Sequence, residues 1–392
     1  MNKIMKFASL LAAAVMLISC GGDNDGGSLS GVLEIKADKN LVQSDGEDYV
    51  TLTVKLDGVT VTSDVVFYEG TTALNVEDFK YFTTVAGDHE IWASYQTYVS
   101  DPITIKAISV QIPETPADPN PSGTAFKSRV MAMHFTGTGC GFCGAMMNAL
   151  EDAYSNEAFK DKVVKAAVHN YAYTSSYPDP AYLSWDWATG MLRVANLNEP
   201  GKTSGVSNPT IVLDYIYGFY YYQSGVTSGQ YMGYVDDILA TKNDACGIAV
   251  NAKLVDGQVV AKVTVKAAKT GNYRIGAMLL EDGIQARQSS SEINMHDACV
   301  RHIDASEKIG NRVHDYGHSL GTIEAGKTAD YLFIWNLADI QKKNDPNYYW
   351  NNFVQENLRM AVFVTNAKND VYQINNAVNV DFNVELPFEY AK

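Results

Sequence analysis

A proline-rich segment constrains the fold of this chain more than any other feature. Residues 111–123, QIPETPADPNPSG, hold four of the chain's 11 prolines. Each proline fixes its own φ angle and removes an N–H donor, so a dense run of prolines is typical of a semi-rigid, extended spacer. With 392 residues the chain is long enough for two or three domains. We therefore expect separately folded parts on the two sides of this linker.

The part before the linker has the pattern of an all-β domain. Tyr49–Leu56, YVTLTVKL, alternates apolar and polar residues at period two, which indicates a half-buried strand. Similar short runs recur at Val32–Lys36, Glu90–Tyr95 and Ile103–Lys106, with turn sequences between them. Regular short strands without helices predict an immunoglobulin-like β-sandwich over residues 31–110.

The part after the linker mixes strands with helices. Val130–Phe135, VMAMHF, is continuously apolar, as expected of a strand covered on both faces. An apolar stripe at helical spacing follows over residues 144–155, and a second apolar strand follows at Val163–Val168. This order predicts an α/β domain over residues 124–245, with an insertion at 170–206.

Alternation at period two returns in the last third of the chain. Val259, Ala261, Val263 and Val265 place an apolar residue at every second position. This pattern predicts a C-terminal β-sandwich over residues 246–392.

The first thirty residues have the pattern of an export signal. Two lysines precede an apolar run from Phe7 to Ile18, which is too short to span a bilayer but suits a signal peptide at residues 1–19. The run ends in LISC, which resembles a bacterial lipobox with Cys20 as the lipidated residue. The alternative is an ordinary signal peptide that contains a cysteine. Residues 20–30 are small and polar, so we expect the lipidated cysteine and a flexible tether.

The overall charge excludes some partners. The formal net charge is −15 at pH 7, which argues against nucleic acid and against anionic lipid headgroups as ligands. The only expected contact with a membrane is the lipid anchor. We find no Gly-rich phosphate loop and no G-x-S-x-G sequence, and we expect no cofactor.

Two cysteines in the stretch TGTGCGFCG, Cys140 and Cys143, are the strongest candidates for chemistry. A zinc site would need four ligands, and the chain has no second C-x-x-C pair, so we expect no metal. As a structural crosslink, a disulfide closing so few residues contributes only roughly 2 kcal/mol. At the start of the predicted helix, however, Cys140 would be stabilised as a thiolate. We therefore predict a redox pair with Cys140 as nucleophile and Cys143 as resolving thiol.

The other two cysteines of the folded part, Cys246 and Cys299, lie far apart in the sequence. A bridge between them would close about 54 residues and contribute roughly 4 kcal/mol. We predict a structural disulfide here; the alternative is two unpaired buried thiols.

The order strand, C-x-x-C, helix, strand, then Asn-Pro before a further strand resembles the thioredoxin superfamily. The resemblance implies that Pro209 is a cis proline facing the dithiol and that Asn208, beside it, helps to position substrate. This chain differs from the family in having Gly139, and not an aromatic residue, before the first cysteine. His134 stands where thioredoxins often bury a carboxylate. This histidine is a candidate proton acceptor for the resolving thiol, or alternatively a packed core residue.

A second resemblance covers roughly residues 124–385. Residues 279–303, LLEDGIQARQSSSEINMHDACVRHI, and residues 358–380 resemble Bacteroidetes lipoproteins related to the twenty-eight-kilodalton outer-membrane protein. The resemblance implies a thioredoxin-like α/β domain flanked by an N-terminal immunoglobulin-like β-sandwich and a C-terminal β-sandwich. It also implies a lipid-anchored location at the outer membrane; exposure at the cell surface is one of the placements left open.

Two functions remain open from the sequence. The first is thiol–disulfide exchange through Cys140 and Cys143, with protein thiols or disulfides as partners. The second is non-enzymatic binding or adhesion to a surface ligand, with the thioredoxin fold as a scaffold.

Overall fold

The molecule contains two compact units, one ending at Ala107 and one beginning at Ile108. The structure is a computed structural model, and it describes residues 31–171, 173–183, 208–220, 227–309, 312–314, 316–344, 352–368 and 371–391. The predicted signal peptide, Cys20 and the tether lie outside the described residues, as does most of the predicted insertion at 170–206.

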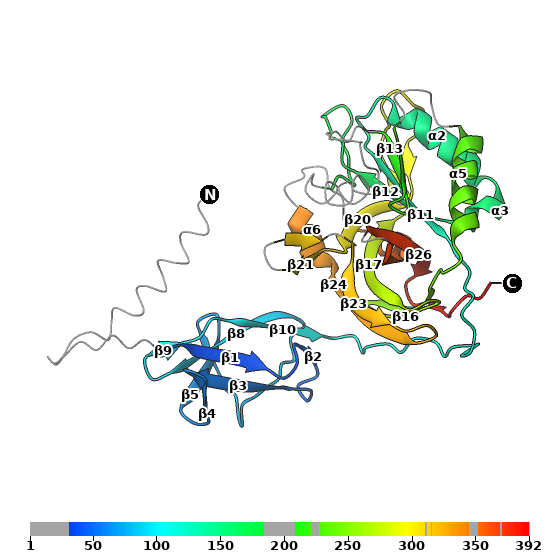
Figure 1. The fold of residues 1–392 in the computed structure, drawn as a ribbon. Helices are drawn as coiled ribbons and strands as arrows, with labels where there is room; N and C mark the ends of the chain where they lie inside the picture. The colour runs from blue at the N-terminus through cyan, green and yellow to red at the C-terminus, as the bar shows by residue number, and fades with distance from the viewer. Residues whose placement is uncertain are drawn as a thin grey trace. The chain divides into compact units, whose positions relative to one another are not determined.

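The first unit consists of two β-sheets packed around one apolar core (Figure 1). One sheet contains β1 (Leu33–Ala37), β3 (Val50–Leu56), β4 (Val59–Val61) and β7 (Lys80–Tyr81). The other contains β2 (Leu41–Gln43), β10 (Ile103–Ile108), β8 (Gly87–Tyr95), β5 (Val65–Glu69), β6 (Thr72–Leu74) and β9 (Tyr98–Val99). In β3 the alternating pattern is realised directly, because Val50, Leu52 and Val54 are buried and the residues between them are more exposed.

The second unit is organised by one nine-stranded sheet (Figure 1). Its order is β14 (Tyr217–Tyr220), β13 (Thr210–Leu213), β11 (Val130–Thr136), β12 (Val163–His169), β20 (Cys299–Asp304), β17 (Gly271–Glu281), β25 (Leu358–Lys368) and β26 (Val371–Asp381), with β23 (His318–Ile323) also pairing with β17. β11 is parallel to β12 and antiparallel to β13. β12 in turn runs parallel to β20, where Ala167 is opposite Cys299.

The remaining elements of the described second unit surround this sheet. A four-stranded sheet contains β24 (Thr328–Asn336), β16 (Gln258–Lys266), β15 (Gly247–Val255) and β27 (Glu385–Leu386). Two small hairpins contain β18 (Ile284–Gln285) with β19 (Met295–His296), and β21 (Glu307–Ile309) with β22 (Arg312–His314). The helices are α2 (Cys143–Tyr154), α3 (Glu157–Lys160), α5 (Ser228–Thr241), α6 (Leu337–Asn344) and the short 3-10 turn η2 (Gln355–Asn357).

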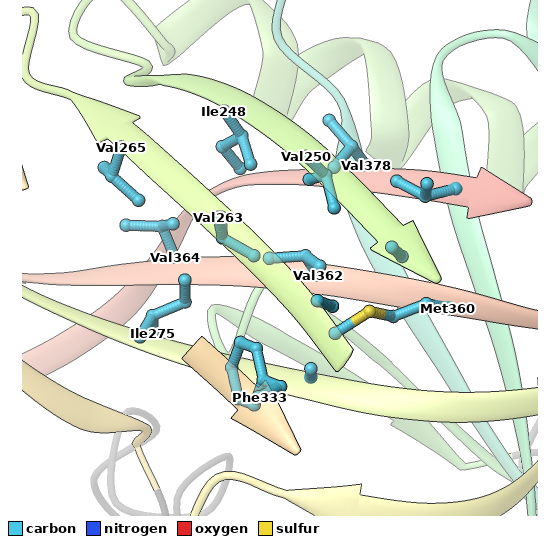
Figure 2. Packing of buried hydrophobic residues seen from close by; sticks show 14 of the residues in the cluster. Ile248, Val250, Val263, Val265, Ile275, Phe333, Met360, Val362, Val364 and Val378 are labelled. Carbon is cyan, nitrogen blue, oxygen red and sulfur yellow. The ribbon is translucent and has the colours of Figure 1, made fainter. Parts of the chain in front are cut away.

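The two larger sheets of the second unit are held together by an aliphatic core. Side chains of β15 and β16 meet side chains of β17 and β25 in this layer; Figure 2 shows Val263 and Val362 among them. Both valines are 0% exposed, and full burial of such a side chain contributes roughly 1.5–3 kcal/mol. A second core joins β11 and β12 to β17, β25 and β26, so the β26 end of the nine-stranded sheet packs against its interior strands β11 and β12.

The expected division near residue 245 is not found. Strands from both sides of this position, such as β12 and β20, belong to the same sheet. The region 246–392 does contribute a sandwich-like pair of sheets, but one of the two sheets continues into β11–β14. Sequence periodicity predicts each strand separately and carries no information on which distant strand it pairs with, so the continuity could not be foreseen.

The proline-rich segment is also not a free spacer. Asp118 accepts a hydrogen bond from Lys266 Nζ at 2.7 Å, and the hydroxyls of Thr115 and Thr264 lie 2.7 Å apart. Proline removes N–H donors, but the carbonyls and carboxylates of this segment remain good acceptors for the side chains of β15 and β16. The segment therefore lies along the second unit.

Candidate functional site

The disulfide between Cys140 and Cys143 lies at the first turn of α2, as predicted. α2 begins at Cys143, and Phe142 before it makes no capping hydrogen bond through its side chain. The first turn also holds no acidic residue. The partial positive charge of the helix start is therefore not neutralised by these side chains, and a thiolate of the reduced pair would be stabilised there.

The sulfurs are covered, whereas the residues between them face solvent. Cys140 is 2% exposed and Cys143 is 0% exposed. Gly141 is exposed, and Phe142 is 55% exposed. A macromolecular partner can therefore contact the turn directly, but it reaches the sulfur of Cys140 only after a local movement.

Part of this cover comes from a segment that lies far from the dithiol in the sequence, residues 288–291, which we call the cover segment. The side-chain amide of Gln288 donates one hydrogen bond to the carbonyl of Cys140 at 2.8 Å and another to the carbonyl of Gly137 at 3.1 Å. Gln288 is 0% exposed. The amide therefore holds the backbone in place at Gly137 and at Cys140, the first cysteine of the pair.

A further hydrogen bond and a close approach hold the cover segment beside the turn. The N–H of Ser289 donates to the carbonyl of Thr138 at 2.7 Å. A Cβ placed on Gly144 would come within 2.6 Å of Ser291 Cβ. Glycine at position 144 is thus required by close approach, and not by an unusual backbone angle.

Asp179 holds the same turn from another side. Its Oδ2 accepts a hydrogen bond from the N–H of Thr138 at 3.0 Å, and its Oδ1 accepts one from the N–H of Ala181 at 3.1 Å. The carboxylate also contacts Nδ1 of His169 at 2.9 Å. Burial opposes its ionisation, but His169 and these donors keep the pKa of Asp179 below its usual value.

Asn208 and Pro209 lie at the same end of β11. The peptide bond between them is cis. Asn208 Nδ2 donates to the carbonyl of Thr136 at 3.1 Å and to Oδ1 of Asn170 at 2.7 Å. Thr136 ends β11, four residues before Cys140, so Asn208 is tied to the strand that leads into the dithiol turn.

His134 is buried and faces the α2 side of β11. Burial, together with the neighbouring His169 and His296, lowers the pKa of His134 to about 3. Its Nε2 has no hydrogen-bond partner in the described part of the chain. Because protonation is so unfavourable, this imidazole is a weak proton acceptor, which argues against the role that the sequence suggested and favours the packed-core alternative.

A cavity of about 210 Å³ is lined by residues of α2, β11, β12 and the segment 293–298. His134, His169 and His296 all contribute to its wall, together with Met147 and Ala298. The described residues contain no cluster of three or more histidine, cysteine, aspartate or glutamate side chains arranged to hold a metal ion. The cavity is therefore polar in part, without the geometry of a metal centre.

The predicted Cys246–Cys299 disulfide is not formed: both cysteines are free and buried. Cys246 belongs to the aliphatic core between the two larger sheets, whereas Cys299 packs with Ala181 and Ile284. The entropy argument that favoured a bridge compares loop lengths and assumes that the two thiols meet. Here the fold places them in different cores.

Several site residues were not identified from the sequence. Gln288 and Asp179 act on the dithiol turn through contacts with residues far away in the chain, 148 positions away for Gln288 and Cys140. His169 contacts both Asp179 and Cys299. In the sequence, His169 is marked only as a polar residue at the end of an apolar strand, and Gln288 only as one polar residue in a polar loop. Neither pattern indicates a contact with the dithiol turn or with Cys299.

Comparisons with known proteins add little. No protein-family model matches the chain, and no curated protein matches it. Among solved structures, HBP35 of Porphyromonas gingivalis is similar, with a TM-score of 0.48 and 14% sequence identity over 67% of this chain and 78% of that chain. Among the helices that the structure describes, none is both long and apolar enough to cross a bilayer.

Proposed function

We propose that this protein is a thiol–disulfide oxidoreductase that acts through Cys140 and Cys143. The observation that carries the proposal is the disulfide at a helix start that has no side-chain cap, with Gly141 and Phe142 exposed to solvent. The surrounding order of β11, α2, β12 and cis-Pro209 before β13 supports a thioredoxin-like domain.

The exchange would proceed in two steps. A substrate thiolate attacks Cys140 Sγ, a new S–S bond forms, and Cys143 leaves as a thiolate at the start of α2. A second substrate thiolate then displaces Cys140, so that the substrate becomes a disulfide and the protein a dithiol. The reverse sequence of steps reduces a substrate disulfide. The residue before a cis proline presents its backbone to an extended substrate, which is the role that we propose for Asn208.

We place this activity in a lipid-anchored protein at the outer membrane, with protein thiols or disulfides as partners. The LISC sequence and the short apolar run before Cys20 support this location. Membrane fractionation of the native protein and of a Cys20→Ser variant tests it, since the variant should be released into the soluble fraction.

The activity is tested with the chain from residue 21 onward. We expect it to oxidise or reduce model dithiol and disulfide substrates, and we expect Cys140→Ser to lower the rate at least a hundredfold. Cys246→Ala is the matched control, because Cys246 is buried in a different core. Equal rates for the unaltered chain and Cys140→Ser would refute the enzymatic proposal.

One observation favours the second function, non-enzymatic binding of a surface ligand. Both sulfurs are almost completely covered, and the cover segment holds the turn closed. On this alternative the disulfide resists mild dithiol reagents, and ligand binding is independent of Cys140.

A further inference from the structure

Cys299 belongs to a buried array with His169 and Asp179, of which only Asp179 also contacts the dithiol turn. Its Sγ lies 3.6 Å from Nε2 of His169, and Nδ1 of the same ring lies 2.9 Å from Oδ1 of Asp179. Cys299 and Asp179 are 0% exposed and His169 is 1% exposed. A thiol beside a base that is itself oriented by a carboxylate is the arrangement of an activated nucleophile.

The electrostatics of His169 agree with this geometry. Burial alone would lower the pKa of His169, but Asp179 and Cys299 outweigh burial and raise it well above its usual value. Because Nδ1 is directed at Asp179, a proton taken from the thiol is held on Nε2, next to the sulfur.

Cys246 provides a natural comparison within the same chain. It is also 0% exposed, but it lies among aliphatic side chains of β15, β16 and β17. Burial outweighs the nearby Lys242 and raises the pKa of Cys246. The two thiols are therefore equally covered and differ in the presence of an imidazole base.

Cys299 is not itself part of the wall of the cavity beneath α2, but two of its neighbours are. His169, which contacts the thiol, and Ala298, which precedes it, both belong to the cavity wall. His134 and His296 belong to the same wall, and Nε2 of His134 and Nδ1 of His296 are buried atoms without a hydrogen-bond partner among the described residues. These side chains are 7% and 1% exposed, and they offer hydrogen bonds that no described residue takes up.

These features limit what can react with the thiol. Complete burial of Cys299 excludes peptides and other large acyl substrates, and a cavity of about 210 Å³ admits only a small molecule. Nε2 of His296 is within 3.0 Å of the carbonyl of Ala286 and donates to it, so its free Nδ1 is an acceptor. A small electrophile that carries its own O–H donor fits this wall.

We propose that Cys299 is a second reactive centre, a nucleophilic thiol that is oxidised by hydroperoxides entering the histidine-lined cavity. His169 is its base, and Asp179 is a positioning residue. The thiolate attacks the terminal oxygen of the peroxide, an S–O bond forms and the O–O bond breaks. The sulfur loses two electrons and becomes a sulfenic acid, and the departing alkoxide or hydroxide takes the proton from His169 to become an alcohol or water.

The test uses the full chain with the Cys140–Cys143 disulfide intact, so that it does not depend on the proposed exchange activity. Hydrogen peroxide is added, sulfenic acid is trapped with a cyclic 1,3-dione, and the modified peptides are measured by mass spectrometry. We expect Cys299 to be labelled at least tenfold faster than Cys246. Labelling of both at the same rate, or of neither, would overturn the proposal.

Two variants separate activation from simple access. His169→Gln should lower labelling of Cys299 to the rate of Cys246, and Cys299→Ser should remove the signal. If His169→Gln unfolds the protein, labelling of Cys246 rises as well. In that case the ratio of Cys299 to Cys246 labelling in the unaltered chain alone tests the proposal. A folded His169→Gln variant that labels Cys299 at the original rate would contradict the assigned base.

Discussion

Cys140 and Cys299 are both buried, but their surroundings differ. Cys140 lies in a turn whose next two residues reach solvent, at the start of a helix. Cys299 lies within the nine-stranded sheet, with its thiol against His169. On the two proposals above, burial of a sulfur does not by itself distinguish a structural cysteine from a reactive one. The groups around each sulfur determine its proposed reactivity. A helix start favours exchange with a docked partner, whereas an imidazole favours attack on a small molecule.

Asp179 connects the two regions. One oxygen accepts a hydrogen bond from Thr138 beside the dithiol, and the carboxylate also contacts His169 beside Cys299. The dithiol turn and the Cys299–His169 pair thus share one buried carboxylate.

The largest effect is expected from Asp179→Ala, which removes that shared group. His169 would lose its counter-charge, and the N–H of Thr138 would lose its acceptor, so we expect the free energy of unfolding to fall by about 3–5 kcal/mol. Denaturant titration measures this loss. Asp237→Ala, an exposed position on α5, is the matched control and should change stability by less than about 0.5 kcal/mol. Comparable small losses in both variants would mean that Asp179 does not link the two sites.

The next effect concerns pH. The pKa values of His134 and His296 are lowered to about 3 and about 4, in both cases chiefly by burial, whereas the unfolded values are near 6.5. Between pH 6.5 and 4.5 the unfolded chain therefore binds protons at these positions and the folded chain does not. The free energy of unfolding falls as pH decreases, by up to about 1.4 kcal/mol per pH unit for each histidine.

His169 does not contribute in that interval. Its raised folded-state pKa means that its contribution is complete below pH 6.5 and is lost as pH rises toward that folded-state value. Denaturant titrations from pH 6.5 to 4.5 measure the slope, and His134→Gln should remove about half of it. A flat profile over this range would show that the cavity histidines do not differ from those of the unfolded chain.

A smaller effect is expected from Gln288→Ala, which acts on the dithiol side alone. Loss of the two hydrogen bonds to the turn removes about 1–3 kcal/mol of local stabilisation, so we expect small dithiols to reduce the Cys140–Cys143 disulfide roughly tenfold faster. Gln285→Ala, an exposed glutamine on β18, is the control. An unchanged reduction rate, with Cys299 reactivity also unchanged, would mean that the cover segment does not restrict the dithiol.

Local elements of this fold are readable from the sequence. The alternation in Tyr49–Leu56 coincides with β3, and the apolar runs before and after the C-x-x-C pair coincide with β11 and β12. The disulfide at the start of α2 also follows from local pattern, because it depends on residues within a few positions of each other.

Long-range pairing is not readable in the same way. Nothing in the pattern around Cys299 shows that β20 lies beside β12, and therefore that Cys299 meets His169 and not Cys246. The position of Gln288 against the dithiol depends on the same pairing, since the cover segment is attached to the hairpin of β18 and β19. Both features arise from strand order, which hydrophobic periodicity does not encode.

The central claim is that Cys140 exchanges disulfides with partners that dock on the turn. Trapping a mixed disulfide tests it most directly. The Cys143→Ser variant is incubated with an oxidised model substrate protein, and in the control with the same substrate protein after reduction and alkylation. We predict a covalent adduct through Cys140 that a dithiol reagent releases, and no adduct with Cys140→Ser. Absence of an adduct with Cys143→Ser under conditions where its Cys140 thiol is free would contradict the account.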